Sequence, residues 1–222
     1  MDPRWRLRGV GCCPFAPLLL PLDGLDPVRA APLADAGVTP FRAVRRAGPW
    51  LGRGSGAAVI GVGGLGQFAV QYLKLLTRAR VFAIDRSEQM LSEAKSLGAD
   101  DVFLAQEAPP RCEAVLDFVG TNETLVLAMK LVKRGGILVE VGEAGGSLPF
   151  GFGKTDFEVT LTSSVWGSLR DLRAVLSFAR RGELQWTVEE AALEGVNEAL
   201  DRLGHEHVAG RAVLRPGMAS AG

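Results

Sequence analysis

A glycine-rich run at residues 61–66, GVGGLG, constrains the fold of this chain more than any other feature. It follows the short apolar run AAVIG at 57–61 and precedes a stretch in which apolar residues recur every three or four positions. A strand before and a helix after are the setting in which a GxGxxG motif binds the pyrophosphate of a dinucleotide. The sequence therefore predicts a dinucleotide site at this turn.

Each glycine of the motif has a separate expected task. Gly61 permits the tight turn, Gly63 lets the backbone approach a pyrophosphate, and Gly66 lets helix and strand pack closely. Gly64 and Leu65 open the helix, whose N-terminus supplies free N–H groups and the positive end of a dipole. The alternative is that these glycines serve only a turn.

An acidic residue, Asp85, ends the next apolar run at about the 20-residue distance at which this motif places a ribose ligand. Its carboxylate would accept hydrogen bonds from the adenosine ribose hydroxyls and repel a 2′-phosphate. The cofactor expected is therefore NAD rather than NADP. The neighbouring Arg86 would weaken that preference.

Apolar runs typical of buried strands alternate with amphipathic stretches typical of helices. Strand patterns occupy 57–61, 80–85, 114–119, 137–141 and 159–166, and helical stripes occupy 65–76, 90–97, 125–132 and 172–179. Such alternation implies right-handed crossovers and a parallel sheet covered on both faces. The fold class predicted is α/β, a doubly wound parallel sheet of the Rossmann type. A further short helix is predicted at 196–203 and a final strand at 211–214.

Composition excludes several other classes of protein. The 25 basic and 25 acidic residues cancel, so no uniform field attracts nucleic acid or an anionic membrane. The longest apolar stretch, 11–22, is short and interrupted by prolines, and residues 1–24 are predicted to be an irregular leader. The cysteines, Cys12, Cys13 and Cys112, form neither a disulfide framework nor a pair with zinc spacing, which favours a reducing, cytoplasmic location.

Four segments carry a resemblance to a known family. They are APLADAGVTPFRAV at 31–44, AAVIGVGGLGQFAVQ at 57–71, AIDRSEQMLSEAKSLGADDV at 83–102 and AGRAVL at 209–214. In order and spacing they resemble the zinc-dependent medium-chain alcohol dehydrogenases, and within them the bacterial secondary-alcohol dehydrogenases in which aspartate is the third ligand of the catalytic zinc. The resemblance covers about residues 20–215.

The resemblance implies roles for further residues. Asp35 takes the position of the third zinc ligand, and Thr39 is the catalytic-site residue beside the nicotinamide. The other cofactor contacts that it implies are pocket residues Val119, Val141 and Gly142, flanking residues Trp166 and Gly167, and Arg211 at the pyrophosphate. Without the resemblance, the sequence also permits purely structural roles for three of these residues. Asp35 would be a polar residue at a helix end, Trp166 a core residue and Arg211 a solvated strand residue.

The chain also departs from the family pattern. No segment matches the β-rich catalytic domain that supplies the zinc-binding cysteine and the His–Glu pair, and His205 and His207 fall outside any ligand pattern. We therefore expect a truncated enzyme, with a dinucleotide-binding domain at 25–185, a remnant of the catalytic domain at 186–222, and zinc implied but not retained.

The function expected is hydride transfer between a small-molecule alcohol or ketone, with a secondary alcohol favoured, and NAD; the chain alone should be inactive. The alternatives are an inactive nucleotide-binding module and a dimerisation remnant that pairs through the strand at 159–166. Partners expected besides the substrate are further copies of the chain, in a homodimer or homotetramer.

Overall fold

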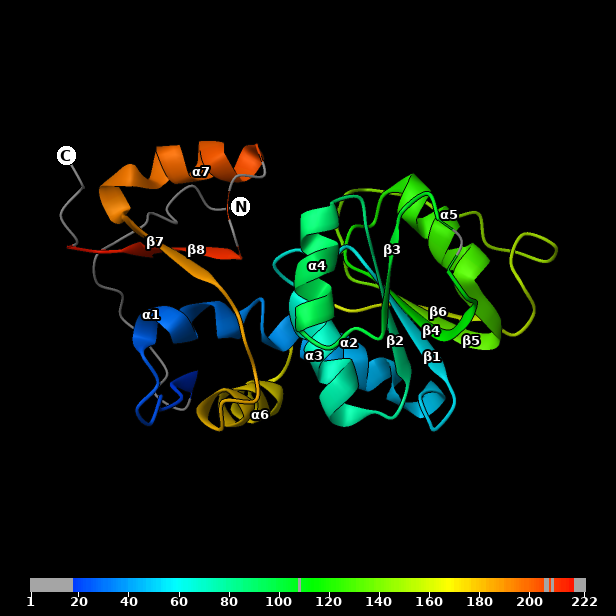
Figure 1. Ribbon diagram of the computed structural model, residues 1–222, viewed down its shortest axis with the longest axis horizontal. Helices are drawn as coiled ribbons and strands as arrows, with labels where there is room; N and C mark the ends of the chain where they lie inside the picture. Colours follow the sequence, from blue (N-terminus) through cyan, green and yellow to red (C-terminus); the bar gives the residue numbers. More distant parts are fainter. Residues whose placement is uncertain (1–17, 108, 206–207, 209, 218–222) are drawn as a thin grey trace. The chain divides into compact units, whose positions relative to one another are not determined.

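The computed structural model describes residues 18–107, 109–205, 208 and 210–217 (Figure 1). By its internal contacts the chain divides into two compact units. Asp35–Val175 form the larger unit, and the smaller unit takes the described residues up to Ala34 and from Leu176 onward. Most of the leader expected at 1–24, including Cys12 and Cys13, lies outside the described residues, as does His207. The domain boundaries expected at 24/25 and 185/186 stay predictions.

The larger unit contains a parallel sheet of six strands in the order β3-β2-β1-β4-β5-β6. From β1 the chain moves outward through β2 and β3, then returns to the other side of β1 and continues through β4, β5 and β6. This confirms the doubly wound α/β fold. The strands are β1 Gly56–Ile60, β2 Arg80–Asp85, β3 Asp101–Leu104, β4 Cys112–Asp117, β5 Val132–Glu140 and β6 Thr160–Ser163.

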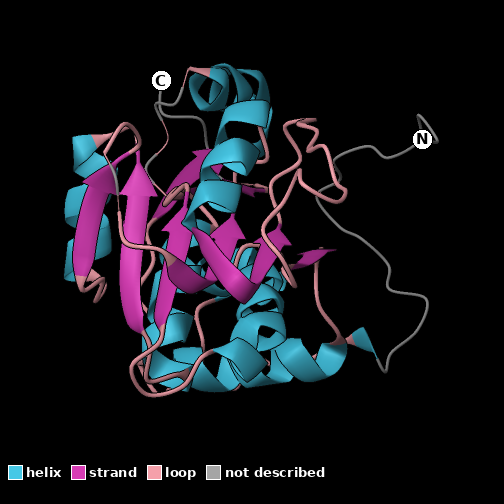
Figure 2. Cartoon of the chain, turned by 90° about the vertical axis from the view of Figure 1, so that its right-hand side faces the viewer, coloured by secondary structure: helices cyan, strands magenta, loops and turns pink. Residues whose placement is uncertain are grey.

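Helices cover both faces of this sheet (Figures 1 and 2). On one face, Leu125 and Ala128 of α5 share a buried core with Val115 and Leu138 of the sheet. On the other, α2 and α3 pack on each other through Phe41 and Tyr72, whose ring centroids lie 5.2 Å apart. The helices of this unit are α2 Val38–Ala47, α3 Gly66–Leu76, α4 Glu88–Ser96, α5 Asn122–Leu131 and the first residues of α6 Leu169–Arg180, with the 3₁₀ turn η3 Gly48–Trp50.

The local sequence signals predicted for the start and the end of α4 are confirmed. The Ser87 side chain accepts a hydrogen bond from the Met90 N–H at the start of the helix. Gly98, just past its end, has φ +106°, a conformation that favours glycine.

Several strand limits differ from the sequence expectation. β4 begins at Cys112 and ends at Asp117, and β5 begins directly after α5, so that Gly135 and Gly136 lie inside the strand. A Cβ on Gly136 would lie 2.7 Å from the Glu113 carbonyl oxygen, so this glycine permits close strand packing rather than ending the helix. β6 ends at Ser163, three residues before the expected end, and β3 and β7 were not predicted.

The smaller unit pairs β7 and β8 in parallel. Beside them, Arg29 and Trp186 form a reciprocal pair: the guanidinium donates to the Trp186 carbonyl at 3.1 Å, and the indole N–H donates to the Arg29 carbonyl at 2.8 Å. The helix and strand predicted at 196–203 and 211–214 are confirmed. The elements are α1 Pro27–Ala30, η2 Ala31–Ala34, β7 Val188–Ala192, η4 Leu193–Gly195, α7 Val196–Gly204 and β8 Arg211–Arg215.

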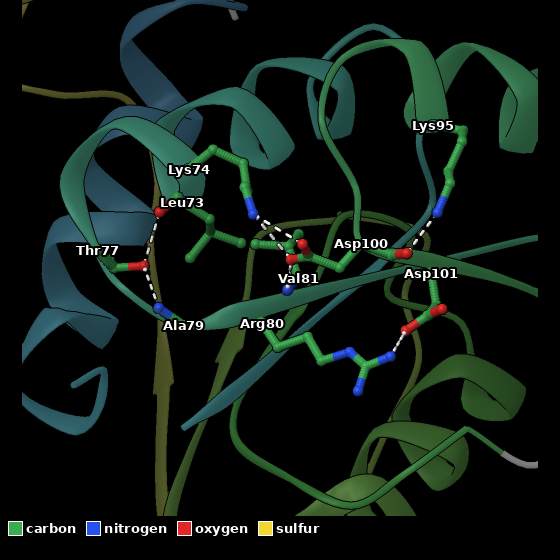
Figure 3. Close-up of polar contacts among 9 residues, drawn as sticks. All are labelled: Leu73, Lys74, Thr77, Ala79, Arg80, Val81, Lys95, Asp100 and Asp101. Atoms are coloured by element: carbon green, nitrogen blue, oxygen red, sulfur yellow. Dashed lines mark hydrogen bonds and ion pairs between the residues drawn. The ribbon is translucent and has the colours of Figure 1, made fainter. Parts of the chain in front are cut away.

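Asp100 connects three elements of the larger unit at the start of β2 (Figure 3). Its carboxylate accepts hydrogen bonds from the Val81 N–H at 2.7 Å and from Lys74 Nζ of α3 at 2.9 Å, and its carbonyl accepts one from Lys95 of α4. Partial burial opposes ionisation, but these hydrogen bonds outweigh it and lower the pKa of Asp100.

Replacing Asp100 with alanine should lower the free energy of unfolding at pH 7 by about 2 kcal/mol, because the buried Val81 N–H loses its acceptor. A lowered folded-state pKa stabilises the fold above the unfolded pKa of about 3.9 and ceases to do so as pH falls through the folded value. The difference between variant and wild type, measured by urea unfolding, should therefore shrink from pH 7 to pH 3. An equal difference at both pH values would contradict this account.

Candidate dinucleotide-binding site

The glycine-rich loop follows β1 at the carboxyl edge of the sheet, where β1 lies between β2 and β4. Parallel sheets bind ligands at this edge, at the point where the strand order reverses. Gly61 has φ +81°, and its N–H donates to the Ile84 carbonyl of β2 at 2.9 Å. The loop is thus fixed at its first residue.

The three motif glycines meet different surroundings. A Cβ on Gly66 would lie 1.9 Å from the Gly61 carbonyl oxygen, and one on Gly61 would lie 2.5 Å from Val119 Cγ2. A Cβ on Gly63 would meet no atom within 4 Å. Gly61 and Gly66 are therefore required by packing, whereas Gly63 is exposed toward open space that a ligand can enter. Gly64 and Leu65, expected to open the helix, instead lie between Gly63 and Gly66, because α3 begins only at Gly66.

Asp85 ends β2 and is half-buried. One carboxylate oxygen accepts a hydrogen bond from the Val62 N–H of the loop at 2.8 Å, and the other accepts one from the Ser87 N–H at 3.0 Å. Each oxygen retains acceptor capacity, because a carboxylate has about four lone-pair sites. Asp85 is thus held beside the loop as a hydrogen-bond acceptor, with the exposed Arg86 following it. These features fit a dinucleotide.

The turns after β4 and β5 meet on the other side of the loop. A Cβ on Gly142 would lie 2.1 Å from the Val119 carbonyl carbon, so the two backbones are in direct contact. The Val141 and Gly142 N–H groups both donate to the Asp117 carbonyl, at 2.8 and 3.1 Å. The structure therefore brings Val119, Val141 and Gly142 together, as the resemblance implies.

Asp117 is a polar residue that sequence reasoning missed, although it interrupts the apolar run AVLDFV. It is fully buried, and its Oδ1 accepts hydrogen bonds from the Val119 and Gly120 N–H groups at 2.9 and 3.1 Å. Among the described residues Oδ2 has no hydrogen-bond partner. Burial, and then the nearby Asp117 charge, raise the pKa of Glu140 on β5. Asp117 fixes the turn that carries Val119.

Asp35 and Thr39 lie one helical turn apart at the start of α2. The Thr39 hydroxyl donates to Asp35 Oδ1 at 3.5 Å, and the Thr39 N–H donates to the Asp35 carbonyl at 3.0 Å. Gly167 packs on this helix end, because a Cβ on it would lie 2.5 Å from Val38 Cγ2. Trp166 is 68% exposed, so it is not the core residue of the alternative interpretation.

The described residues do not fit a zinc site. Among them, no group of three or more His, Cys, Asp or Glu side chains could hold a metal ion. Cys112 is buried, and burial raises the pKa of its thiol to about 12, which disfavours the thiolate that binds metals. His205 is exposed directly after α7, with Nδ1 2.7 Å from the Asp201 carbonyl oxygen. No catalytic step through zinc is derived from these residues.

A hollow of about 410 Å³ between α4 and β3 is lined by Leu91, Lys95 and Leu104 among others, and no residue of the glycine loop lines it. Arg211, the remaining predicted cofactor contact, begins β8 in the smaller unit. In the part of the chain that the structure describes, no helix has the length and apolar character needed to cross a bilayer.

Comparison with known protein families matches residues 64–181, a little over half of the chain, to the family described as zinc-binding dehydrogenase. The chain belongs to the zinc-binding dehydrogenase family. The match begins in the glycine loop and ends one residue after α6. The six-strand parallel sheet and the glycine loop are thus the nucleotide-binding half of a zinc-binding dehydrogenase.

Individual members of the zinc-binding dehydrogenase family are similar over most of this chain. An alcohol dehydrogenase of Geobacillus stearothermophilus is 36% identical over 208 residues, covering 87% of this chain and 59% of that protein. A D-arabinose 1-dehydrogenase (NADP(+)) of Saccharolobus solfataricus is 33% identical over 211 residues, covering 89% of this chain and 60% of that protein. The structure of acetophenone reductase from Geotrichum candidum in complex with NAD is 30% identical with a TM-score of 0.76, covering 86% and 57%. The chain therefore spans about three fifths of the length of these relatives.

Proposed function

We propose that the chain binds NAD(H) as the nucleotide-binding half of an alcohol dehydrogenase, whose reaction is hydride transfer between an alcohol, with a secondary alcohol favoured, and the nicotinamide. The single observation that carries the proposal is the Asp85 carboxylate, held 2.8 Å from the Val62 N–H of the glycine loop. A ribose whose pyrophosphate lies on that loop would meet this carboxylate first. Relatives bearing the names alcohol dehydrogenase and acetophenone reductase support the substrate class.

Different residues of the chain would bind different parts of the cofactor. Backbone N–H groups of the loop and the start of α3 would bind the pyrophosphate, with open space beside Gly63 for its approach. Asp85 would accept hydrogen bonds from the ribose hydroxyls. The bound nicotinamide would supply the hydride acceptor. Residues proposed to lie around that ring are Thr39, Val119, Val141, Gly142, Trp166 and Gly167; Arg211 at the pyrophosphate and Asp35 as a zinc ligand stay predictions from the resemblance.

NADH should bind more tightly than NADPH, by about tenfold or more, because the Asp85 carboxylate would face a 2′-phosphate. One relative carries NADP(+) in its name, so the choice depends on local charge rather than on the family. Calorimetric titration of the chain with both cofactors measures the ratio.

Asp85→Ser should bring the affinities for NADH and NADPH closer together, because it removes both the acceptor for the ribose hydroxyls and the negative charge. Asp101→Ser, which alters a carboxylate paired with Arg80 at the start of β3, is the matched control and should leave the ratio unchanged. Equal affinities of the wild-type chain for NADH and NADPH would contradict the assignment of Asp85 as the ribose-binding residue that favours NADH.

The finer expectations belong to the same proposal. They are an alcohol or ketone substrate, a cytoplasmic location, no nucleic acid or membrane partner, and a homodimer or homotetramer. The last is supported by β6, which ends the sheet at one edge. A nucleotide-binding module without turnover is the second candidate function, favoured by the poor fit of the described residues to zinc.

A further inference from the structure

The carboxylate of Asp171 binds four donor groups although its side chain is only 2% exposed. Oδ2 accepts hydrogen bonds from the Ser168 N–H at 2.9 Å and the Ser168 hydroxyl at 2.8 Å. Oδ1 lies 2.5 Å from Nη1 of Arg45, and Oδ2 lies 3.5 Å from Nη1 of Arg42. Burial opposes ionisation of this group, but the Ser168 and Arg45 contacts outweigh it and lower the pKa of Asp171.

These contacts connect two elements far apart in sequence. Ser168 and Asp171 begin α6 and cap it reciprocally, because the Ser168 hydroxyl also accepts from the Asp171 N–H at 3.2 Å. Arg42 and Arg45 lie on one face of α2, three residues apart. A carboxylate that only capped α6 would need neither arginine. Asp171 therefore also fixes the start of α6 against α2.

The segment that this connection holds is the turn between β6 and α6. Trp166 adopts φ +47°, which a bulky side chain rarely does unless its surroundings impose it. Gly167 cannot accept a side chain, because its Cβ would meet Val38 of α2. Val165 and Trp166 are nevertheless 58% and 68% exposed, so the turn presents two apolar side chains outward.

The strand order locates this turn relative to a dinucleotide. A pyrophosphate on the loop after β1 leaves one half of the cofactor toward β2, which carries Asp85, and the other half toward β4, β5 and β6. The Val165–Ser168 turn follows β6 at the carboxyl edge, so it belongs to the second side. Among the described residues, the side-chain partners of Asp171 are Ser168, Arg42 and Arg45, none of which belongs to the glycine loop.

We propose that Asp171 is a positioning residue for the nicotinamide half of the cofactor, acting by fixing the Trp166–Gly167 turn against the start of α2. The inference rests on the proposed NAD(H) binding. On this proposal the adenosine half of the cofactor depends on the loop and Asp85, whereas the nicotinamide half also depends on Asp171, which acts through the Trp166–Gly167 turn.

The test compares NADH with ADP-ribose, which shares the adenosine, pyrophosphate and ribose but lacks the nicotinamide. Asp171→Ala should weaken NADH binding about tenfold or more and remove the change in nicotinamide fluorescence on binding, while ADP-ribose affinity changes less than about twofold. Arg45→Ala, at a half-exposed position, keeps the cap of α6 and should act in the same direction as Asp171→Ala. Asp171→Glu, which keeps the charge, should restore part of the NADH affinity.

Asp100→Ala is the matched control, because Asp100 also joins a backbone N–H and a cation between elements but does so at the start of β2 (Figure 3). It should lower stability without changing the ratio of NADH to ADP-ribose affinity. If Asp171→Ala does not fold, Arg45→Ala alone decides the matter. An unchanged ratio in the folded variants overturns the positioning role, whereas a wild-type chain that binds neither ligand overturns the proposed function instead.

Discussion

Gly66→Ala is expected to destabilise the larger unit by about 3 kcal/mol or more and to abolish NADH binding. The new Cβ would lie 1.9 Å from the Gly61 carbonyl oxygen, a backbone atom that cannot move without shifting the loop away from β1. Gly61 itself is held by its hydrogen bond to the Ile84 carbonyl, so the strain would pass to the whole turn.

Gly63→Ala is the matched control for this prediction. Its Cβ would meet no atom within 4 Å, so the free energy of unfolding should change by less than about 0.5 kcal/mol. NADH affinity should still fall about tenfold or more, because the methyl group enters the space needed by the pyrophosphate. Thermal unfolding and calorimetric titration of both variants check the contrast. Unchanged NADH binding by Gly63→Ala would show that the ligand does not approach the loop from that side.

The second large effect concerns metal and turnover. The purified 222-residue chain should hold well under one zinc per chain and oxidise no alcohol above background, because a catalytic zinc needs about three protein ligands and an open position. The described residues offer Asp35 without two further ligands beside it. NADH binding should persist, and Asp35→Ala should leave NADH affinity nearly unchanged.

Metal analysis by mass spectrometry, with and without added zinc, measures the zinc content per chain. NADH formation from NAD in the presence of secondary alcohols measures alcohol oxidation. If the catalytic half of a relative is supplied in trans, Asp35→Ala should abolish the activity that is restored. One tightly held zinc in the unmodified chain would contradict the account and direct attention to Cys12, Cys13 and His207, which lie outside the described residues.

The sheet and the cofactor loop were predictable because their determinants are local. The buried strands are short apolar runs. The residues that start and stop α4, Ser87 and Gly98, lie directly beside that helix in the sequence. β3 was missed because its four residues are only half-buried and follow α4 closely. β7 was missed because two of its five residues are glutamates, which interrupt the apolar pattern.

The expected strand at 159–166 was too long because composition does not reveal where pairing stops. β6 pairs with β5 only up to Ser163, after which Trp166 turns with a positive φ. Nor could the partners of Asp171 be foreseen, since Arg45 lies 126 residues away in sequence. The three-residue spacing of Ser168 and Asp171, typical of a helix cap, was the one local signal available.

Hydrogen–deuterium exchange of the wild-type chain with and without NADH tests the central claim most directly, because it reports both binding and its place. Bound NADH should slow exchange at the amides of the glycine loop and the first turn of α3, and at the residues around Asp85. Binding without protection at residues 61–67, or protection confined to the hollow between α4 and β3, would contradict this claim.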